Sequence, residues 1–314
     1  MSTKPSASLQ RQGIGWSNAM FTAVTATATA LILLILVCIL GNIVLNGLPN
    51  LSWRFVSTIP KENFFDANTT GVLAMIIGTT IRVLVMTLFV IPVGVITAVY
   101  LTEYARAGSA YTRVIRAAVN NLAGVPSIVF GLFGVGFFMN FIGGNLDVML
   151  HEPSPHWKQP SVLWASLTLA VMTLPVVIVT TEEALKTIAP GLREASLALG
   201  ATKLETIWKI VLPNAMPGIL TGGILAVSRA AGEVAPILFT GAAYYMAELP
   251  KSLTHQFMDL GYHIYVLSTQ SPDIEKTRPI LYATVLVLLL LTFSLNAIAI
   301  FARARMRKAM RAGH

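Results

Sequence analysis

The sequence predicts an all-α membrane protein with six transmembrane helices. Of its 314 residues, 55% are hydrophobic and only 11% are charged, whereas a soluble domain has roughly 25% charged residues. The apolar residues gather into long continuous runs that lack the polar alternation of barrel strands. Because backbone groups cannot stay unpaired in lipid, runs of this length form helices.

Six stretches are long enough to cross a hydrocarbon core, which requires about 20 apolar residues. They are Phe21 to Leu45, Gly71 to Leu101, Ala117 to Leu146, Ser161 to Thr181, Ala215 to Ala247 and Pro279 to Ala302. The first is expected to be a retained anchor (21–45) after a cytoplasmic N-terminus (1–20), because its 25 uncharged residues exceed a usual signal-peptide core. Residues 71–302 are then expected to form a core of five spans, followed by a basic tail (303–314).

The distribution of Lys and Arg predicts the orientation, since cytoplasmic loops carry an excess of them. With the N-terminus inside, fourteen lie in cytoplasmic segments and six in outside loops. Both termini are therefore expected in the cytoplasm, on the inner side of the membrane. The basic tail is expected to contact anionic membrane lipid rather than nucleic acid, because no basic run is interleaved with aromatic residues in a soluble segment.

A charged cytoplasmic loop, residues 182–214, separates the fourth and fifth spans. Thr202 followed by Glu205 is a capping box that starts a helix, and Pro213 is expected to stop that helix. Gly200 supplies a sharp turn after a preceding amphipathic helix. The loop is therefore predicted to be a helix-turn-helix hairpin with an exposed apolar face.

The same hairpin resembles the E-A-A-x3-G-x9-I-x-L-P loop of ABC importer permeases. The matching residues are Glu194, Ala195, Ser196, Gly200, Ile210, Leu212 and Pro213. Ser196 stands where the family favours Ala, a change of one hydroxyl. The resemblance implies a type I ABC importer permease fold in which these coupling helices enter a cleft on the ATP-hydrolysing subunit.

Three further segments narrow the resemblance to phosphate-importer permeases. Residues 122–133 and 228–236 resemble segments of that family, and residues 261–267 resemble its PstA type more than its PstC type. The resemblance implies transport of phosphate together with a homologous PstC-type permease, two PstB-type ATPases and a PstS-type extracytoplasmic binding protein. The sequence has no P-loop motif. We therefore expect no cofactor on this chain, which would not be an enzyme, with ATP and Mg used by the partner ATPase.

Three charged side chains lie well inside spans, where a charge costs roughly 2.5 to 3.5 kcal/mol. Arg82 and Arg229 lie at similar depth and could converge on phosphate, whose oxygens match the planar guanidinium fork. Glu233 follows Arg229 by four residues, so the two are expected to share a helix face and to pair when no anion is present. A purely structural pair is the alternative for Arg229, and Arg82 could instead pair with a carboxylate of another subunit. Ser127 could line the pathway or bond its own helix backbone.

Other functions fit part of the pattern. A permease for another oxyanion, such as sulfate or molybdate, would use the same arginines. A secondary transporter could use Arg229 and Glu233 as a proton or ion relay, but it would have no ATPase for the hairpin to dock. No metal site is expected, because His151 and His156 are five residues apart and separated by two prolines.

Overall fold

The computed structural model describes residues 16–60, 65, 70–106, 108–246 and 248–312. Within these ranges the chain is mainly helical, and one isolated β-bridge joins Ala242 to Phe257. Six helices of the described ranges are long and apolar enough to cross a membrane. The predicted all-α fold with six spans is thus confirmed.

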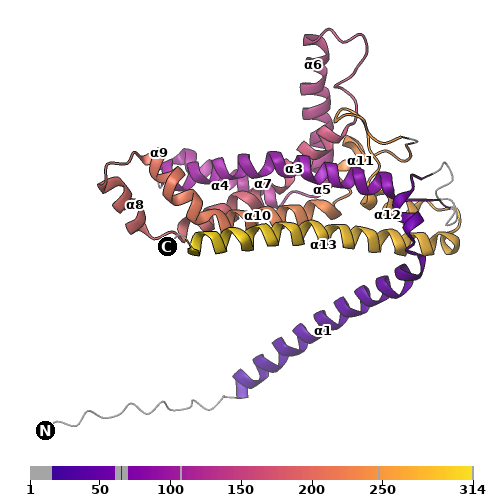
Figure 1. Cartoon of the computed structure of the whole chain (residues 1–314), viewed down its shortest axis with the longest axis horizontal. Coiled ribbons are helices and arrows are strands. Elements are labelled where there is room, and N and C mark those ends of the chain that lie inside the picture. Colours follow the sequence, from indigo (N-terminus) through magenta and orange to yellow (C-terminus); the bar gives the residue numbers. More distant parts are fainter. Residues whose placement is uncertain (1–15, 61–64, 66–69, 107, 247, 313–314) are drawn as a thin grey trace.

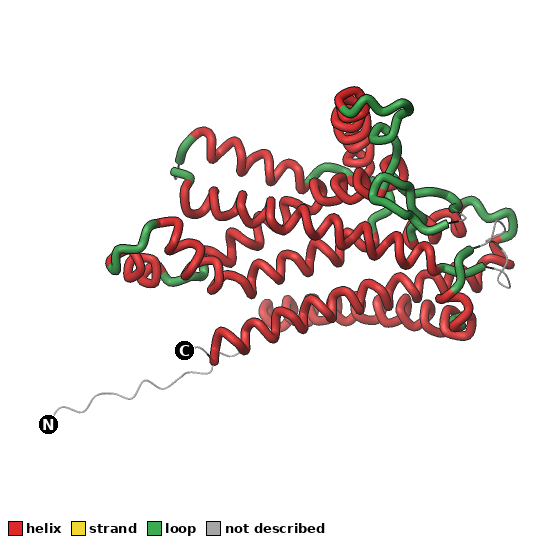
Figure 2. Tube along the Cα trace, turned by 45° about the horizontal axis from the view of Figure 1, so that its top comes forward, coloured by secondary structure: helices red, strands yellow, loops and turns green. Residues whose placement is uncertain are grey.

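Four long helices lie side by side along the long axis of the molecule (Figures 1 and 2). They are α3 (Leu73–Val99), α7 (Val162–Lys186), α10 (Leu212–Gly232) and α13 (Ile274–Ala312). The central helix is α7, which packs on both α3 and α10. Gly94 of α3 lies directly against Val177, and Gly222 of α10 lies against Thr180. These glycines allow the close backbone approach on which helix packing in membranes depends.

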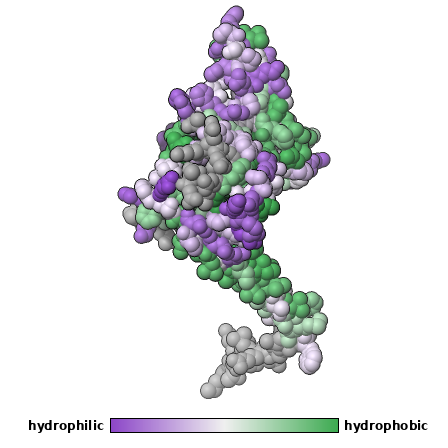
Figure 3. Space-filling view, turned by 90° about the vertical axis from the view of Figure 1, so that its right-hand side faces the viewer, coloured by the Kyte–Doolittle hydropathy of each residue, from purple (hydrophilic) through white to green (hydrophobic). Residues whose placement is uncertain are grey.

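The first span, α1 (Trp16–Gly47), contacts the bundle only near its C-terminal end, where Gly47 packs against the backbone of Tyr282 in α13. The rest of the helix leaves the bundle (Figure 1), and none of its apolar window is buried. Hydrophobic side chains cover it where it projects from the molecule (Figure 3). This surface needs lipid or another membrane protein around it. Residues 1–15 of the predicted cytoplasmic N-terminus lie outside the described residues.

The expected third span, Ala117 to Leu146, is not one helix. The helix α4 (Ala110–Ala123) ends before Pro126, and α5 (Ser127–Phe133) begins after it. The prediction was wrong here because Pro126 has no N–H to continue the helix, and the residue before a proline is biased away from helical angles. From α5 the chain continues through π-helical turns, η3 (Gly134–Gly143), into α6 (Gly144–Met149), which projects steeply from the bundle (Figure 1).

The fifth span was also placed wrongly, at both ends. At the far end α10 stops at Gly232 rather than near Ala247, because Glu233 is extended, with φ −77° and ψ 131°. At the near end Pro213 does not stop the preceding helix. Short α9 (Lys203–Thr206) passes through π-helical turns, η4 (Ile207–Val211), into α10. Pro213 stands in the first turn of α10, where proline is tolerated.

The short elements gather at the two ends of the bundle. The hairpin of α8 (Pro190–Ala198) and α9 lies at the same end as the C-terminal end of α13 (Figure 1). The residues expected as a basic tail continue α13 as helix as far as Ala312. The remaining elements are η1 (Leu48–Asn50), α2 (Trp53–Ser57), η2 (Tyr100–Tyr104), α11 (Ile237–Thr240) and α12 (Leu260–Thr269).

Candidate functional site

Arg82 lies in a buried junction of three helices. Its Nη2 is 2.8 Å from Oδ2 of Asp259, and both side chains are fully buried. The guanidinium also donates to the carbonyl oxygens of Ala230, at 2.9 Å, and Ala231, at 3.3 Å. Thr79 adds a 2.9 Å hydrogen bond to the same Asp259 oxygen. Arg82 therefore joins α3 to the C-terminal end of α10 and to the residue that caps α12.

The suggestion that Arg82 pairs with a carboxylate of another subunit was wrong. The carboxylate belongs to Asp259 of the same chain, not to another subunit. The sequence placed Asp259 in an outside loop, so its burial beside α3 was missed. The cost of an arginine inside a span did signal that a partner must exist, but not which residue it was.

Arg229 has a contrasting environment near the end of α10. Its Nε is 3.6 Å from Oε1 of Glu233, and the two side chains are 43% and 22% exposed. The predicted pairing is confirmed. The shared helix face is not, since Glu233 lies one residue beyond the end of α10. Although Arg82 bonds the backbone directly after Arg229, the two guanidinium groups lie in different surroundings, one enclosed and one open.

Ser127 is the first residue of α5, directly after the break at Pro126, and its side chain is half-buried. Within the described part of the chain no hydrogen bond joins it to Arg82 or Arg229. Its role in a pathway stays a prediction.

The hairpin has the geometry expected for it. Thr202 and Glu205 form the predicted capping box at the start of α9. Gly200 has φ +84° with open space around its Cα, a conformation that glycine adopts without strain. Glu194 and Ala195 are exposed on α8, and Ser196 bonds Thr206 across the hairpin at 2.9 Å.

The second half of the motif is more enclosed. Ile210 and Leu212 are half-buried, whereas Pro213 is exposed. The apolar tip of the hairpin is open, with Leu199 89% exposed. An exposed apolar face of this kind is typical of a surface that binds another protein.

A charged clamp that the sequence did not reveal fixes the hairpin to the bundle. Arg193 of α8 donates to Glu103 of η2, at 2.9 Å, and to the carbonyls of Leu185 and Ile188, at 2.8 and 2.7 Å. Lys203 of α9 donates to the Glu103 carbonyl and lies 4.8 Å from the centre of the Tyr104 ring. The hairpin is thereby attached to the ends of both α3 and α7.

A model of the family described as "Binding-protein-dependent transport system inner membrane component" matches residues 90–310. The chain belongs to this family. It is a multi-pass membrane protein of the permease type, and the hairpin lies inside the matched region.

Named relatives support the assignment. The permease is 32% identical over 276 residues to the probable ABC transporter permease protein YqgI of Bacillus subtilis, covering 84% of this chain and 87% of that protein. It is 33% identical over 274 residues to the phosphate transport system permease protein PstA of Yersinia pestis, covering 86% and 85%. It is 39% identical over 168 residues to PstA 1 of Mycobacterium tuberculosis H37Rv, about half of each chain, 54% and 49%.

Among solved structures, a chain of a bacterial alginate ABC transporter has the same fold. Its TM-score is 0.63 at 15% sequence identity, with 95% of the permease and 98% of that chain covered. This likeness confirms the ABC importer permease fold.

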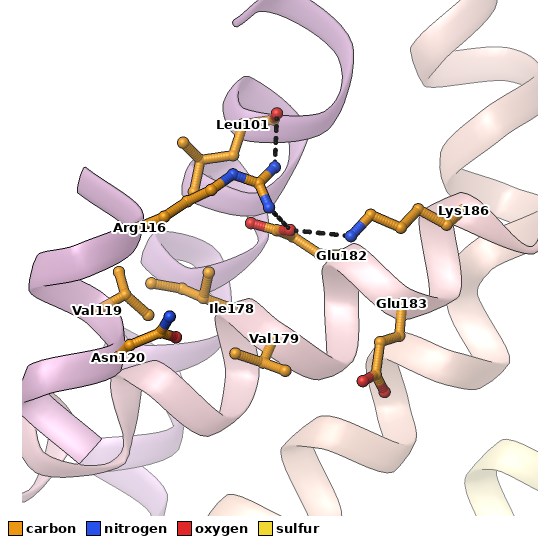
Figure 4. Close-up of a pocket in the computed structure, with 9 residues that line it drawn as sticks. All are labelled: Leu101, Arg116, Val119, Asn120, Ile178, Val179, Glu182, Glu183 and Lys186. Atoms are coloured by element: carbon orange, nitrogen blue, oxygen red, sulfur yellow. Dashed lines mark hydrogen bonds and ion pairs between the residues drawn. The ribbon is translucent and has the colours of Figure 1, made fainter. Parts of the chain in front are cut away.

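A further charge cluster, which was not predicted from the sequence, lies between α4 and the end of α7 (Figure 4). Arg116 lies 3.0 Å from Glu182 and donates to the Leu101 carbonyl at 3.3 Å, while Lys186 reaches the same carboxylate at 3.4 Å. The cluster borders a hollow of about 210 Å³. It was missed because its members come from three segments distant in sequence.

Proposed function

We propose that this permease is one of two homologous membrane subunits of an ATP-driven phosphate importer. Arg229 carries the proposal, because it is an arginine inside a candidate span whose side chain is 43% exposed and whose ion pair, among the residues that the structure describes, is the long one with Glu233. Relatives of matching length that are named phosphate transport system permease proteins support the choice of substrate.

The geometry suits reversible binding of an anion. Phosphate oxygens accept two parallel hydrogen bonds from a guanidinium fork, and arginine stays charged at every physiological pH. A bound phosphate displaces Glu233 from Arg229, and the ion pair forms again after release. Arg82 has no such freedom, so we assign it to the fold rather than to the pathway.

The partners follow from the parts the chain has and lacks. Its sequence has no P-loop, so a separate ATPase subunit must hydrolyse ATP with Mg, and the α8–α9 hairpin is the surface on which it docks. An extracytoplasmic binding protein delivers the phosphate, and a second permease completes the pathway. By resemblance these are of the PstB, PstS and PstC types.

The substrate is tested by uptake of labelled phosphate and labelled sulfate in cells that lack this chain, with and without its gene restored. Restored phosphate uptake alone is expected. Restoration of sulfate uptake alone would contradict the proposed substrate.

Docking is tested at Gly200. A β-branched residue at φ +84° is strained by about 1 to 3 kcal/mol, so Gly200→Val should detach or uncouple the ATPase while the spans still insert. ATPase co-purification and uptake measure this. The matched control is Gly191→Ala in α8, where a Cβ also meets open space but φ is not positive. An ATPase that stays bound and coupled to Gly200→Val would disprove the docking role.

The orientation is tested with a cysteine at position 309, introduced in a Cys38→Ala background. An impermeant thiol reagent should label it only from the cytoplasmic face. Labelling of intact cells from outside would show that the predicted topology is inverted. The hairpin would then lie outside the cell, where the ATPase could not bind it.

A further inference from the structure

A second, larger hollow lies at the hairpin end of the bundle, beside the cluster of Figure 4. Its volume is about 520 Å³, within the usual range for ligand pockets. It is bounded by the end of α3 with η2, by the N-terminus of α4 and by the last turn of α7. Among its lining residues are Thr102, Ser109, Arg113, Arg116 and Lys186.

The charge of this basic hollow is strongly positive. Its described lining residues include three cationic side chains and no carboxylate. Arg116 and Lys186 share the single carboxylate of Glu182, yet their side chains remain 42% and 57% exposed. Among the described residues, Arg113 makes one long hydrogen bond, of 3.5 Å, to the carbonyl of Gly108. Three positive charges are thus balanced by one negative charge.

Neutral donors face the same space. The helix α4 is 14 residues long, and its cap residue Ser109 makes no side-chain capping bond, so no side chain at the cap position occupies the first N–H groups of the helix, which can bind an anion. The Thr102 hydroxyl is buried and has no hydrogen-bond partner within the described part of the chain. Both observations indicate that an acceptor from outside the chain belongs here.

We propose that the basic hollow binds a phosphate group, carried either by an anionic phospholipid or by inorganic phosphate. Arginine and lysine side chains with helix N–H groups form the donor set that phosphate oxygens prefer. The hollow lies at the end of the candidate span Leu73–Tyr104, and basic pockets between spans bind such lipids. The inorganic-phosphate form of the proposal rests on the proposed function. The lipid form does not.

The test uses the purified full-length chain in nanodiscs that contain phosphatidylglycerol and phosphatidylcholine. Native mass spectrometry counts the lipids that stay bound, and equilibrium dialysis against radiolabelled inorganic phosphate measures binding of the free anion. The variant is Arg113→Gln with Lys186→Gln, which spares Arg116 and its bond to the Leu101 backbone. The matched control is Lys251→Gln with Lys276→Gln, two exposed lysines remote from the hollow.

Loss of two charge-assisted hydrogen bonds should weaken binding at least about tenfold in the hollow variant and not in the control. Selective loss of phosphatidylglycerol identifies a headgroup site, and selective loss of labelled phosphate identifies a site for the free anion. Thr102→Val, which keeps every charge, should give a smaller loss of the same ligand. Unchanged binding of both ligands in the double variant, or no binding by the wild type, overturns the proposal.

Phosphate uptake by cells separates this result from the proposed function. If restoring the chain restores no phosphate uptake but lipid retention still depends on Arg113 and Lys186, the proposed function fails and the basic hollow stands. If uptake is restored and neither ligand depends on these residues, the proposed function stands and the basic hollow fails.

Discussion

Arg82 and Arg229 are the same residue type inside the same bundle, but their surroundings differ in every respect that determines their role. Arg82 is fully buried, 2.8 Å from a buried carboxylate, and bonded to two carbonyls. The side chain of Arg229 is 43% exposed, and its ion pair with Glu233 is longer, at 3.6 Å. The charge of the first is used within the chain, whereas the charge of the second is available to a ligand. An arginine in a span therefore indicates function only once its partners are known.

The largest expected effect tests the enclosed arginine. Arg82→Gln leaves Asp259 as an unpaired buried charge, which typically costs 3 to 5 kcal/mol, a large part of an ordinary folding stability. We expect little monodisperse protein by size-exclusion chromatography and a lower melting temperature, whereas exposed Arg54→Gln serves as an unaffected control. Normal protein yield with abolished uptake would instead place Arg82 in the transport pathway. Arg82 and Arg229 would then have the same kind of role.

The next effect tests the open arginine. Arg229→Gln removes the guanidinium fork, so phosphate uptake should fall at least about tenfold while the yield of the assembled complex stays normal. Arg229→Lys should retain partial uptake at most, since a point charge replaces a bidentate fork.

Glu233 sharpens the same test. Glu233→Gln leaves Arg229 without its counter-charge and should slow release of phosphate rather than its entry. The double variant Arg229→Gln with Glu233→Gln should assemble normally yet not transport. Recovery of uptake in the double variant would show that the pair only stabilises the bundle, and Arg229 would lose its assignment.

The smallest effect concerns the pH response of the helix beyond the Arg82 junction. His263 of α12 is buried, and the loss of hydration lowers its pKa from 6.5 to about 3. Below pH 6.5, His263 therefore binds a proton in the unfolded chain but stays neutral in the folded chain. Stability is full above that pH and falls as pH drops toward 3, by roughly 2 kcal/mol at pH 5.

Melting temperatures at pH 7.5 and pH 5 measure this response. The drop should shrink in His263→Gln and persist in His255→Gln, because His255 is exposed at the same end of the molecule. Equal drops in the wild type and in His263→Gln would mean that His263 is not held neutral by the fold.

Periodic and local sequence patterns predicted the fold well, whereas contacts between distant segments could not be predicted from the sequence. Six apolar runs predicted six spans, because a single apolar segment in lipid can satisfy its backbone hydrogen bonds only as a helix. The Thr202 capping box and the Gly200 turn were predictable since each depends on residues within one helical turn. The end of α10 at Gly232 was not predicted, because the apolar run continues past it while the backbone becomes extended at Glu233. The partners of Arg82, Arg116 and Arg193 come from distant segments, and no spacing rule reveals such pairs.

The clamp of Arg193 has a mechanical consequence. One guanidinium is fastened at once to the end of α7 and to Glu103 beyond α3, and Lys203 fastens α9 to the same point. These bonds therefore hold the hairpin in a fixed orientation relative to the bundle, so that it does not turn as a hinge. A displacement of α8 is therefore passed to the ends of α3 and α7 together.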